Sequence, residues 1–294
     1  MLEKCEMCPF ECKVNRKQGE KGKCKAGLLP KVALASIHKY EEPCISGTNG
    51  SGTVFFSNCN LNCVFCQNYK ISHEGFGKEV TIERLAEIFI EQQEKGVHNI
   101  NLVSPTIYVE QIVEALDIAK SRGLNIPVIY NSSGYEKVET IKKIKGYIDI
   151  YMPDFKYMED ELGEKYSKVK NYSEYAKSSI IEMINQVGKP QFENNIMKKG
   201  VIIRHLALPN HIGNSIKFLD WINENVKENA MISIMAQYFP TENSMKTDLN
   251  RKLTMREYKK VEDYLYSLEL ENGYMQELGK NEENYVPKFD LSNI

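Results

Sequence analysis

The eight cysteines of this 294-residue chain are gathered near its amino-terminal end, and none occurs after Cys66. They form two groups and one single residue: Cys5, Cys8, Cys12 and Cys24; Cys59, Cys63 and Cys66; and Cys44. Buried structural cysteines would be scattered through a core, and in a reducing compartment clustered cysteines are more often metal ligands than disulfides. The segregation of the cysteines therefore predicts metal ligation.

The second group, Cys59-x3-Cys63-x2-Cys66, has the spacing of an iron–sulfur loop. Thiolates are the usual ligands of iron–sulfur clusters. Three of them can hold three irons of a [4Fe–4S] cubane and leave the fourth iron without a protein ligand, and an open coordination site is typical of a catalytic metal centre. The alternatives for these three residues are a zinc knuckle or reduced cysteines of the core.

From about residue 50 onward, short apolar runs alternate with longer amphipathic segments. The runs predict buried strands at Gly52–Ser57, Asn99–Val103, Pro127–Tyr130, Ile148–Met152, Gly200–Leu208 and Met231–Ala236. The segments between and after them predict helices at Ile82–Lys95, Val109–Ser121, Tyr135–Ile144, Ser173–Val187, Ser215–Asn225 and Thr254–Leu268.

Six strand–helix units in succession predict an α/β fold with right-handed crossovers and a curved parallel sheet. An eight-stranded barrel needs about 250 residues, so we expect an incomplete (β/α)6 barrel of the TIM type over residues 49–279. We expect a small cysteine-rich, metal-binding extension at residues 1–48 and a polar tail at residues 280–294. Because barrels carry their active sites at the carboxyl ends of the strands, Cys59, Cys63 and Cys66 follow the first strand at the expected place.

Charge and hydropathy narrow the class of protein. The formal net charge is −2, which provides no overall field for nucleic acid or anionic lipid, so a nucleic-acid partner is not expected. No apolar stretch approaches the about 20 residues that span a bilayer, and the first residues lack the apolar core of a signal peptide. We expect a cytoplasmic protein with no membrane partner.

A cysteine loop of the form CxxxCxφC after the first strand of a repeating α/β chain resembles the radical S-adenosylmethionine (SAM) superfamily. The fuller context, GTVFFSNCNLNCVFCQNYKIS, together with the amino-terminal CxxCPxxC segment, is similar to the branch related to pyruvate formate-lyase activating enzyme. The resemblance implies a [4Fe–4S] cluster on Cys59, Cys63 and Cys66, SAM as cofactor, and a reducing donor similar to flavodoxin or ferredoxin. It also implies a protein or peptide substrate.

The resemblance suggests further site residues at successive strand ends. These are Phe65, Ser104, Thr106, Asn131, Ser133, Asp154 and Arg204 as cofactor-binding residues, and Lys156 as a residue facing the active site. In glycyl-radical activating enzymes a GGE-type motif follows the second strand, whereas this chain has Asn101-Leu-Val-Ser-Pro-Thr106 there. The Asp154-x-Lys156 pair is similar to a motif whose Asp helps to hold a monovalent cation.

The first cysteine group, Cys5-x2-Cys8-x3-Cys12-x11-Cys24, predicts a second metal site. The segment has too few apolar residues to form its own core, so metal is expected to stabilise its fold. Its spacing suits either a structural zinc or a second iron–sulfur cluster.

The leading functional prediction is a radical SAM enzyme that cleaves SAM reductively, generates a 5′-deoxyadenosyl radical and abstracts hydrogen from a protein or peptide. Glycyl-radical activation of a formate-lyase-like partner is the form that the resemblance implies. The alternatives are radical modification of another substrate and a non-catalytic iron–sulfur or zinc protein that serves electron transfer or scaffolding. Radical methylation through a two-cysteine mechanism is disfavoured because no cysteine follows Cys66.

Overall fold

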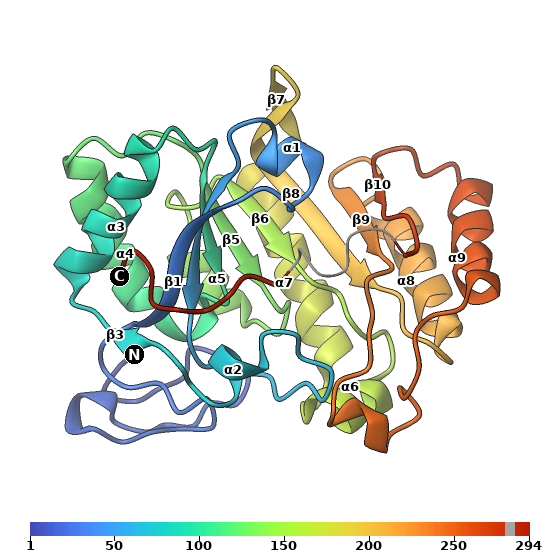
Figure 1. Ribbon diagram of the computed structural model, residues 1–294, viewed down its shortest axis with the longest axis horizontal. Helices are drawn as coiled ribbons and strands as arrows, with labels where there is room; N and C mark the ends of the chain where they lie inside the picture. The colour runs from blue at the N-terminus through green and yellow to red at the C-terminus, as the bar shows by residue number, and fades with distance from the viewer. Residues whose placement is uncertain (280–285) are drawn as a thin grey trace.

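The computed structural model describes residues 1–279 and 286–294, and a curved, mostly parallel β-sheet forms its centre (Figure 1). The ten strands of the described residues form one sheet in the order β10-β9-β8-β6-β5-β4-β2-β1-β3, and β7 pairs with β8. The strands are β1 (Lys31–His38), β2 (Ser51–Phe56), β3 (Lys78–Glu79), β4 (Ile100–Val103), β5 (Val128–Ser132), β6 (Ile150–Pro153), β7 (Gln191–Glu193), β8 (Ile196–Leu206), β9 (Met231–Met235) and β10 (Gly273–Met275).

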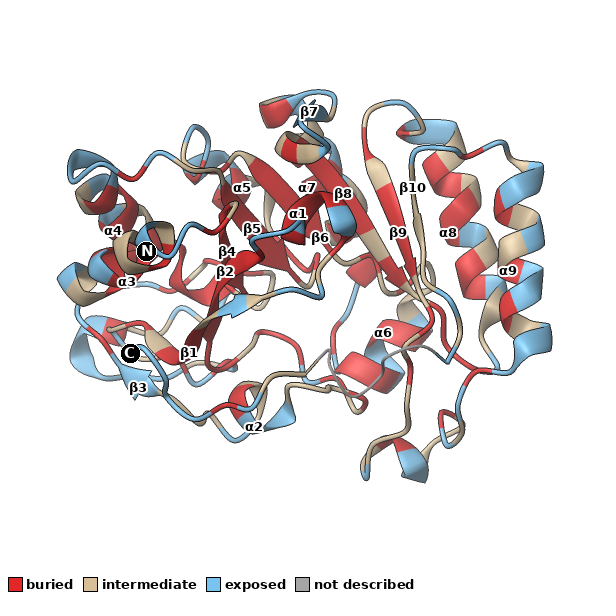
Figure 2. Cartoon of the chain, turned by 45° about the horizontal axis from the view of Figure 1, so that its top comes forward, coloured by how far each residue is buried: buried red, intermediate tan, exposed pale blue. Residues whose placement is uncertain are grey.

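Helices follow most of the parallel strands and cover the outer face of the sheet. The α-helices are α1 (Pro43–Ser46), α2 (Tyr69–Ser72), α3 (Ile82–Glu94), α4 (Val109–Ser121), α5 (Val138–Lys143), α6 (Asp160–Ser167), α7 (Tyr172–Val187), α8 (Ile212–Asn225) and α9 (Met255–Ser267). Short 3-10 helices occur at η1 (Arg16–Gln18), η2 (Thr106–Tyr108) and η3 (Ser244–Lys246). In Figure 2 the central strands β2, β4, β5 and β6 are buried along their length, while α3, α8 and α9 are buried on one side only.

Alternation along each strand separates an inner face from an outer face. On β5, β6 and β8 the residues Ile129, Ile150 and Ile202 point inward, where they pack with Cys44 and Ile45 of α1. Their neighbours Tyr130 and Tyr151 belong to the larger cluster under the outer helices. The short helix α1 therefore plugs the interior of the sheet at one end.

The fold prediction is confirmed. All six predicted strands are present as β2, β4, β5, β6, β8 and β9, and all six predicted helices as α3, α4, α5, α7, α8 and α9. The sheet between β2 and β10 is parallel throughout and does not close on itself, as expected of an incomplete barrel. The strand β10 extends it beyond the six predicted units.

The boundary expected between residues 48 and 49 falls after a strand that belongs to the sheet. β1 pairs antiparallel with β2, with His38 opposite Ser51 and Val32 opposite Phe56. Residues 31–48 are therefore part of the barrel wall and its plug, and residues 1–30 precede the first strand of the sheet. β1 was not predicted because the strand periodicity was followed only from residue 50 onward.

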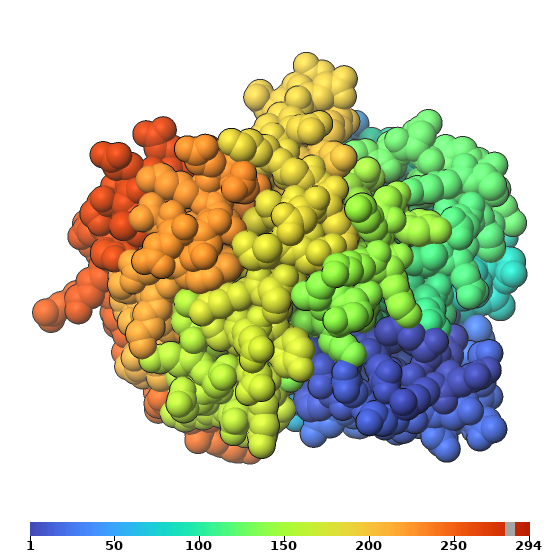
Figure 3. Space-filling view, turned by 180° about the vertical axis from the view of Figure 1, so that it is seen from behind, coloured from blue at the N-terminus to red at the C-terminus, as the bar shows by residue number. Residues whose placement is uncertain are grey.

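The amino-terminal segment packs against the outside of the barrel rather than projecting from it. In the space-filling view from behind, it forms one continuous patch beside the residues around 140 (Figure 3). The Thr140 hydroxyl donates to the Met7 carbonyl at 2.7 Å, and the rings of Phe10 and Tyr135 meet edge to face at 5.9 Å. The extension is thus docked on the first residues of α5 and the turn before it.

The other end of the chain also packs on the barrel. Of the predicted polar tail, residues 280–285 lie outside the described residues. The Leu291 amide donates to the Ala33 carbonyl of β1 at 3.2 Å, and Phe289 is buried against Phe55 of β2. The segment 286–294 therefore covers β1 and β2 (Figure 1). No helix in the described part of the chain is long and apolar enough to cross a membrane.

The turn after β5 depends on a glycine. Gly134 has a left-handed φ of +76°, and a Cβ on it would lie 2.0 Å from the Asp154 carbonyl oxygen. We expect Gly134→Ala to lower the free energy of unfolding by about 2 kcal/mol or more beyond the effect of Gly146→Ala. Gly146 is the matched control because its φ is +84° and no atom lies within 4 Å of its Cβ position. Urea unfolding midpoints measure the difference, and equal midpoints would show that no steric constraint acts at Gly134.

A buried carboxyl between β5 and α5 makes stability depend on pH. Glu136 is fully buried, accepts a hydrogen bond from the Thr106 hydroxyl at 2.6 Å and one from Tyr130 at 3.3 Å, and its burial raises its pKa to about 7. Between its unfolded pKa and this value, only the unfolded chain is ionised, so stability falls as pH rises through that window.

Glu136→Gln removes this titration and keeps an acceptor for Thr106. From about pH 5 to about pH 8, the wild type is expected to lose about 3 kcal/mol relative to Glu136→Gln. Unfolding free energies measured at both pH values check this, with Glu139→Gln on the exposed surface as control. A wild-type-to-Gln difference that does not change with pH would contradict it.

Candidate active site

A cavity of about 550 Å³ occupies the inner face of the barrel and opens near the carboxyl ends of the strands. Cys59, Cys63 and Cys66 line one part of it. Of the other predicted site residues, those that also line it are Phe65, Ser104, Asn131, Ser133, Asp154, Lys156 and Arg204. The structure thus brings together residues from five stretches of sequence, because parallel strands end at the same edge of the sheet.

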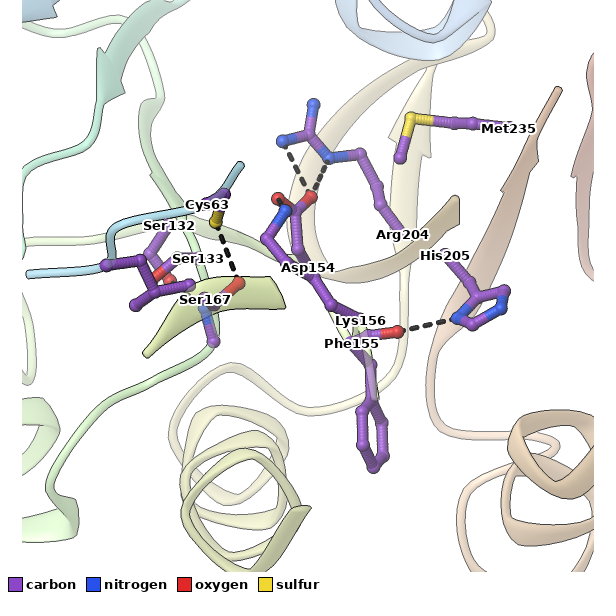
Figure 4. A network of polar contacts seen from close by, with 12 residues as sticks. Cys63, Ser132, Ser133, Asp154, Phe155, Lys156, Ser167, Arg204, His205 and Met235 are labelled. Atoms are coloured by element: carbon purple, nitrogen blue, oxygen red, sulfur yellow. Dashed lines mark hydrogen bonds and ion pairs between the residues drawn. The ribbon is translucent and has the colours of Figure 1, made fainter. Parts of the chain in front are cut away.

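The three cysteines lie on the irregular loop between β2 and α2. The Cys66 amide donates to the Cys63 carbonyl at 3.2 Å, which turns the loop so that its thiols share one cavity. Cys63 Sγ lies 2.9 Å from the Ser167 hydroxyl of α6 (Figure 4), and Cys66 Sγ lies 3.2 Å from the Ser72 hydroxyl of α2. Through these two contacts, α6 and α2 fix the position of the cysteine loop.

The surroundings of these thiols oppose their ionisation in the free chain. Burial, and then the neighbouring cysteines, raise the pKa of Cys59 far above its ordinary value. Burial also raises the pKa of Cys63 to about 11, although the nearby Lys156 ammonium acts in the opposite direction. A bound metal that takes up the thiolates would supply the missing stabilisation. The cysteines are free of disulfides, as metal ligation requires.

The three thiols fit a cubane cluster better than a single ion. No three Cys, His, Asp or Glu side chains in the described ranges are arranged around one metal ion. A cubane does not need such convergence, because each thiolate binds a different iron. The donor set of three free thiols on one loop, all lining a cavity, therefore suits a [4Fe–4S] cluster with one iron left open.

Asp154 is the centre of a buried ion-pair network at the end of β6. Its Oδ2 accepts from the Lys156 ammonium at 2.6 Å, and its Oδ1 lies 3.0 Å from both Nε and Nη2 of Arg204. Burial alone would raise the Asp154 pKa, but the two cations hold it below its ordinary value. Figure 4 shows Arg204 and Asp154 pointing toward each other beside Cys63.

The network also limits what else Asp154 can bind. Both of its carboxylate oxygens already accept from Lys156 and Arg204. The monovalent cation that the sequence resemblance implied would therefore have to displace one of these partners.

The cavity is also lined by four further predicted residues: Phe65, Ser104, Asn131 and Ser133. Asn131 Oδ1 accepts from Arg204 Nη2 at 2.6 Å, so this amide is oriented by the ion-pair network. Phe65 is buried and meets the Tyr238 ring edge to face at 5.9 Å. Ser104 has a left-handed φ of 60°, and Ser133 lies within 3.5 Å of Asn60.

Thr106 is placed elsewhere. It does not line this cavity, and its hydroxyl donates instead to the buried Glu136 behind β5. The reason is that η2 begins at Thr106 and turns its side chain away from the end of β4. His205 also lies in the core, where its ring forms hydrogen bonds with the Phe155 carbonyl at 2.6 Å and the Ser215 hydroxyl at 2.9 Å. In Figure 4 it points away from Asp154.

Two acidic residues of the cavity were not predicted. Glu41 and Glu42 lie on the loop between β1 and α1 and line the cavity at the end remote from the cysteines. Glu41 Oε2 lies 3.4 Å from Arg204 Nη1. Glu41 Oε1 accepts a hydrogen bond from the Asn101 side-chain amide at 3.1 Å. The sequence signal that could have identified them is the pair of adjacent acids before Pro43, shortly after the apolar run of β1.

The first cysteine group also comes together. Cys5, Cys8 and Cys24 are buried, Cys12 is partly exposed, and all are free thiols. Burial raises the Cys8 pKa to about 12, and the three other cysteines of the group add to the shift. Arg16 is buried beside them, with its Nη2 3.6 Å from Cys24 Sγ. A Cβ on Gly22 would lie 2.8 Å from Cys12 Sγ, so the turn requires glycine.

The two groups of cysteines are neighbours in space. A second cavity of about 390 Å³ is lined by both Cys24 and Cys59, together with Phe10, Tyr69 and Ser167. Cys59 lines the main cavity as well. The loop that carries Cys59 is therefore the wall between the two cavities.

Comparison with known proteins identifies the family. Residues 53–211, more than half of the chain, match the Radical SAM superfamily. An uncharacterised protein of Methanocaldococcus jannaschii is 33% identical over 272 residues, which cover 89% of this chain and 74% of that protein.

Solved structures agree on the fold. A radical SAM methyltransferase from Sphaerobacter thermophilus superposes with a TM-score of 0.52 at 13% identity, over 79% of this chain and 67% of that one. SuiB of Streptococcus suis, in a structure bound to the precursor peptide SuiA, superposes with a TM-score of 0.50 at 15% identity. The match covers 75% of this chain and 47% of SuiB, so this chain corresponds to about half of that protein. With the sequence match, these findings show that the chain belongs to the radical SAM superfamily, whose enzymes use a [4Fe–4S] cluster and SAM.

Proposed function

We propose that this protein cleaves SAM reductively at a cluster held by Cys59, Cys63 and Cys66, and uses the radical to abstract hydrogen from a protein or peptide. The observation that carries the proposal is the common cavity of three free thiols with Asp154, Lys156 and Arg204. When bound, the cluster would supply the electron that converts SAM into methionine and a 5′-deoxyadenosyl radical.

The protein's own part in this chemistry is to bind and orient SAM. In the proposal, Arg204 interacts with the SAM carboxylate, since a guanidinium fork matches a carboxylate, and Asn131, Ser104 and Ser133 donate or accept hydrogen bonds to its polar groups. Phe65 offers a ring face or edge for the adenine. Lys156, close enough to Cys63 to lower its pKa, adds positive charge beside an anionic cluster.

Burial of the site supports radical chemistry of this kind. Asp154, Lys156 and Arg204 are mostly enclosed, with side-chain exposures of 15%, 17% and 14%. An enclosed cavity excludes water and unintended hydrogen donors. The paired charges keep their positions without help from solvent, so the cofactor would meet a preorganised wall.

The substrate class is a narrower proposal. Support for a peptide or protein comes from the sequence resemblance to the branch of pyruvate formate-lyase activating enzyme and from SuiB, whose structure contains the bound precursor peptide SuiA. Glycyl-radical activation is the form that this resemblance favours. Radical modification of another substrate is the competing reading, because one fold hosts many substrates. A non-catalytic electron-transfer or scaffold role predicts full protein ligation of the cluster, which three cysteines do not give.

We also propose that Cys5, Cys8, Cys12 and Cys24 bind metal. Four free thiols, most of them buried in a segment whose only regular element is η1, support this. Zinc would make the site structural. The cavity shared by Cys24 and Cys59 favours an iron–sulfur cluster instead, because it would place a second redox centre between the surface and the catalytic loop. An external donor similar to flavodoxin or ferredoxin would then reduce that centre first.

Cys63→Ala tests the catalytic proposal. After anaerobic reconstitution, wild-type protein reduced in the presence of SAM is expected to form 5′-deoxyadenosine, and the variant is expected to lose it by at least about a hundredfold, because two thiolates cannot hold the cluster in place. Cys44→Ala is the matched control, since Cys44 lies on α1, is buried against Ile129, Ile150 and Ile202, and is not among the residues that line the cavity. The proposal fails if wild-type protein with a full cluster makes no 5′-deoxyadenosine, or if Cys63→Ala equals the control.

Metal analysis of a triple Cys59/Cys63/Cys66→Ala variant tests the second metal site. Reconstituted variant is expected to retain about four irons and four sulfides per chain, and the further change Cys24→Ala is expected to remove them. One zinc in their place would assign a structural site. A variant that retains neither metal would refute ligation by the amino-terminal cysteines.

A further inference from the structure

The loop between β1 and α1 forms the floor of the main cavity. β1 runs antiparallel to β2, so its last residues lie at the amino ends of the parallel strands, opposite the cysteine loop. α1 closes the barrel below this point by packing Cys44 and Ile45 on Ile129, Ile150 and Ile202. The cavity therefore has two distinct ends, with thiols at one and Glu41 and Glu42 at the other.

Glu42 has a carboxylate oxygen without a partner. The residue is 9% exposed, lines the cavity, and its Oε2 is buried and makes no hydrogen bond. A buried carboxylate oxygen without a donor is costly, and native structures rarely leave one unpaired unless something else binds it.

Glu41 is only weakly compensated. Its closest cation, Arg204, lies 3.4 Å away, and the same guanidinium is closer to Asp154 at 3.0 Å and Asn131 at 2.6 Å. Burial raises the Glu41 pKa to about 7 despite Arg204, and Glu42 adds to the shift. The electrostatics of the floor thus favour an added positive charge.

In the enclosed part of the cavity as a whole, acidic side chains also outnumber cationic ones. The enclosed acids are Glu41, Glu42 and Asp154, and the enclosed cations facing them are Lys156 and Arg204, both already bound to Asp154. Lys39, also on the floor loop, is exposed to solvent. Between the two ends, Leu206, Met235 and Met275 supply apolar surface to a wall that also contains polar residues such as Ser233 and Gln276.

We infer that Glu41 and Glu42 form a subsite for the cationic end of the substrate, an ammonium or guanidinium group on an aliphatic chain. The ammonium would donate to the Glu42 carboxylate where this residue lines the cavity, and its aliphatic chain would lie along Leu206, Met235 and Met275, with carbon–hydrogen bonds directed toward the cysteine end. This deepens the proposed function and rests on it, since it names a lysine, arginine or amine side chain as the part of the substrate that enters the cavity.

Direct binding tests the subsite without turnover. With the cluster oxidised and SAM present, the holoenzyme is titrated calorimetrically with N-acetyl-lysine methylamide, with its arginine counterpart and with the uncharged norleucine analogue. We expect one of the charged probes to bind and the norleucine probe to bind at least about tenfold more weakly, as loss of a charge-assisted hydrogen bond implies. This comparison needs no variant and so does not depend on one folding.

Glu42→Gln provides the second arm, with Glu139→Gln as the exposed control. The charged probe is expected to bind about tenfold more weakly to Glu42→Gln, while SAM affinity and cluster content stay at wild-type values. Equal binding of charged and uncharged probes, or no binding of any, overturns the subsite. A loss of SAM affinity in Glu42→Gln with probe binding intact also overturns it and assigns the carboxylate to the SAM ammonium.

The two proposals fail separately. An enzyme that forms 5′-deoxyadenosine but does not discriminate between the probes refutes the cationic subsite alone. One that binds the charged probe but never forms 5′-deoxyadenosine with a full cluster refutes the catalytic proposal.

Discussion

The ion pairs of Asp154 are the constraint on which the cavity depends. An isolated carboxylate in this position would be strongly destabilising, and it is tolerated only because Lys156 and Arg204 both bind it. Arg204 in turn reaches Asn131 of β5 and Glu41 of the β1–α1 loop. One buried carboxylate thus connects β5, β6, β8 and the floor loop. Removal of any partner would leave an uncompensated charge beside the three thiols.

The same network explains why Arg204 is tolerated within an apolar strand. β8 contains the run Val201, Ile202 and Ile203 before Arg204, and Ile202 faces the plug while Ile203 faces the outer helices. Arg204 lies on the inner face with Ile202, two residues further along the strand. There it meets Asp154 at an isolated bridge between the two strands. Alternation along β8 therefore sends His205 into the core and Arg204 into the cavity.

Much of this arrangement could be predicted from the sequence because its signals are local. Continuous apolar runs gave the six parallel strands, and the ends of those strands gave Asp154, Lys156 and Arg204. Thr106 shows the limit of that reasoning: it follows β4 as Ser104 does, but the 3-10 turn that begins at Thr106 directs it to Glu136. A strand end indicates which residues are near a cavity, whereas the backbone of the following turn decides which of them face it.

Glu41 and Glu42 show a second limit of prediction from the sequence. They follow β1, an antiparallel strand whose position depends on pairing with β2 and on a bulge between Val32 and Leu34. No local pattern says that the loop after such a strand enters the barrel. Long-range pairing decides this, and so it also decides that Glu41 meets an arginine 163 residues further along the chain.

Some parts of the cavity lie inside the region that matches the superfamily and others lie outside it, and this difference bears on substrate specificity. The cysteine loop and the strand ends belong to the matched region, residues 53–211, where shared chemistry is expected. The floor, with Glu41 and Glu42, lies before that region, and the lining residues Met235 and Met275 lie after it. A superfamily that keeps one reaction and changes its substrates needs constant residues around the cofactor and variable ones elsewhere. Under the proposed function, residues inside the matched region would hold the cluster and SAM, and Glu41 and Glu42, which lie outside it, would contact the substrate.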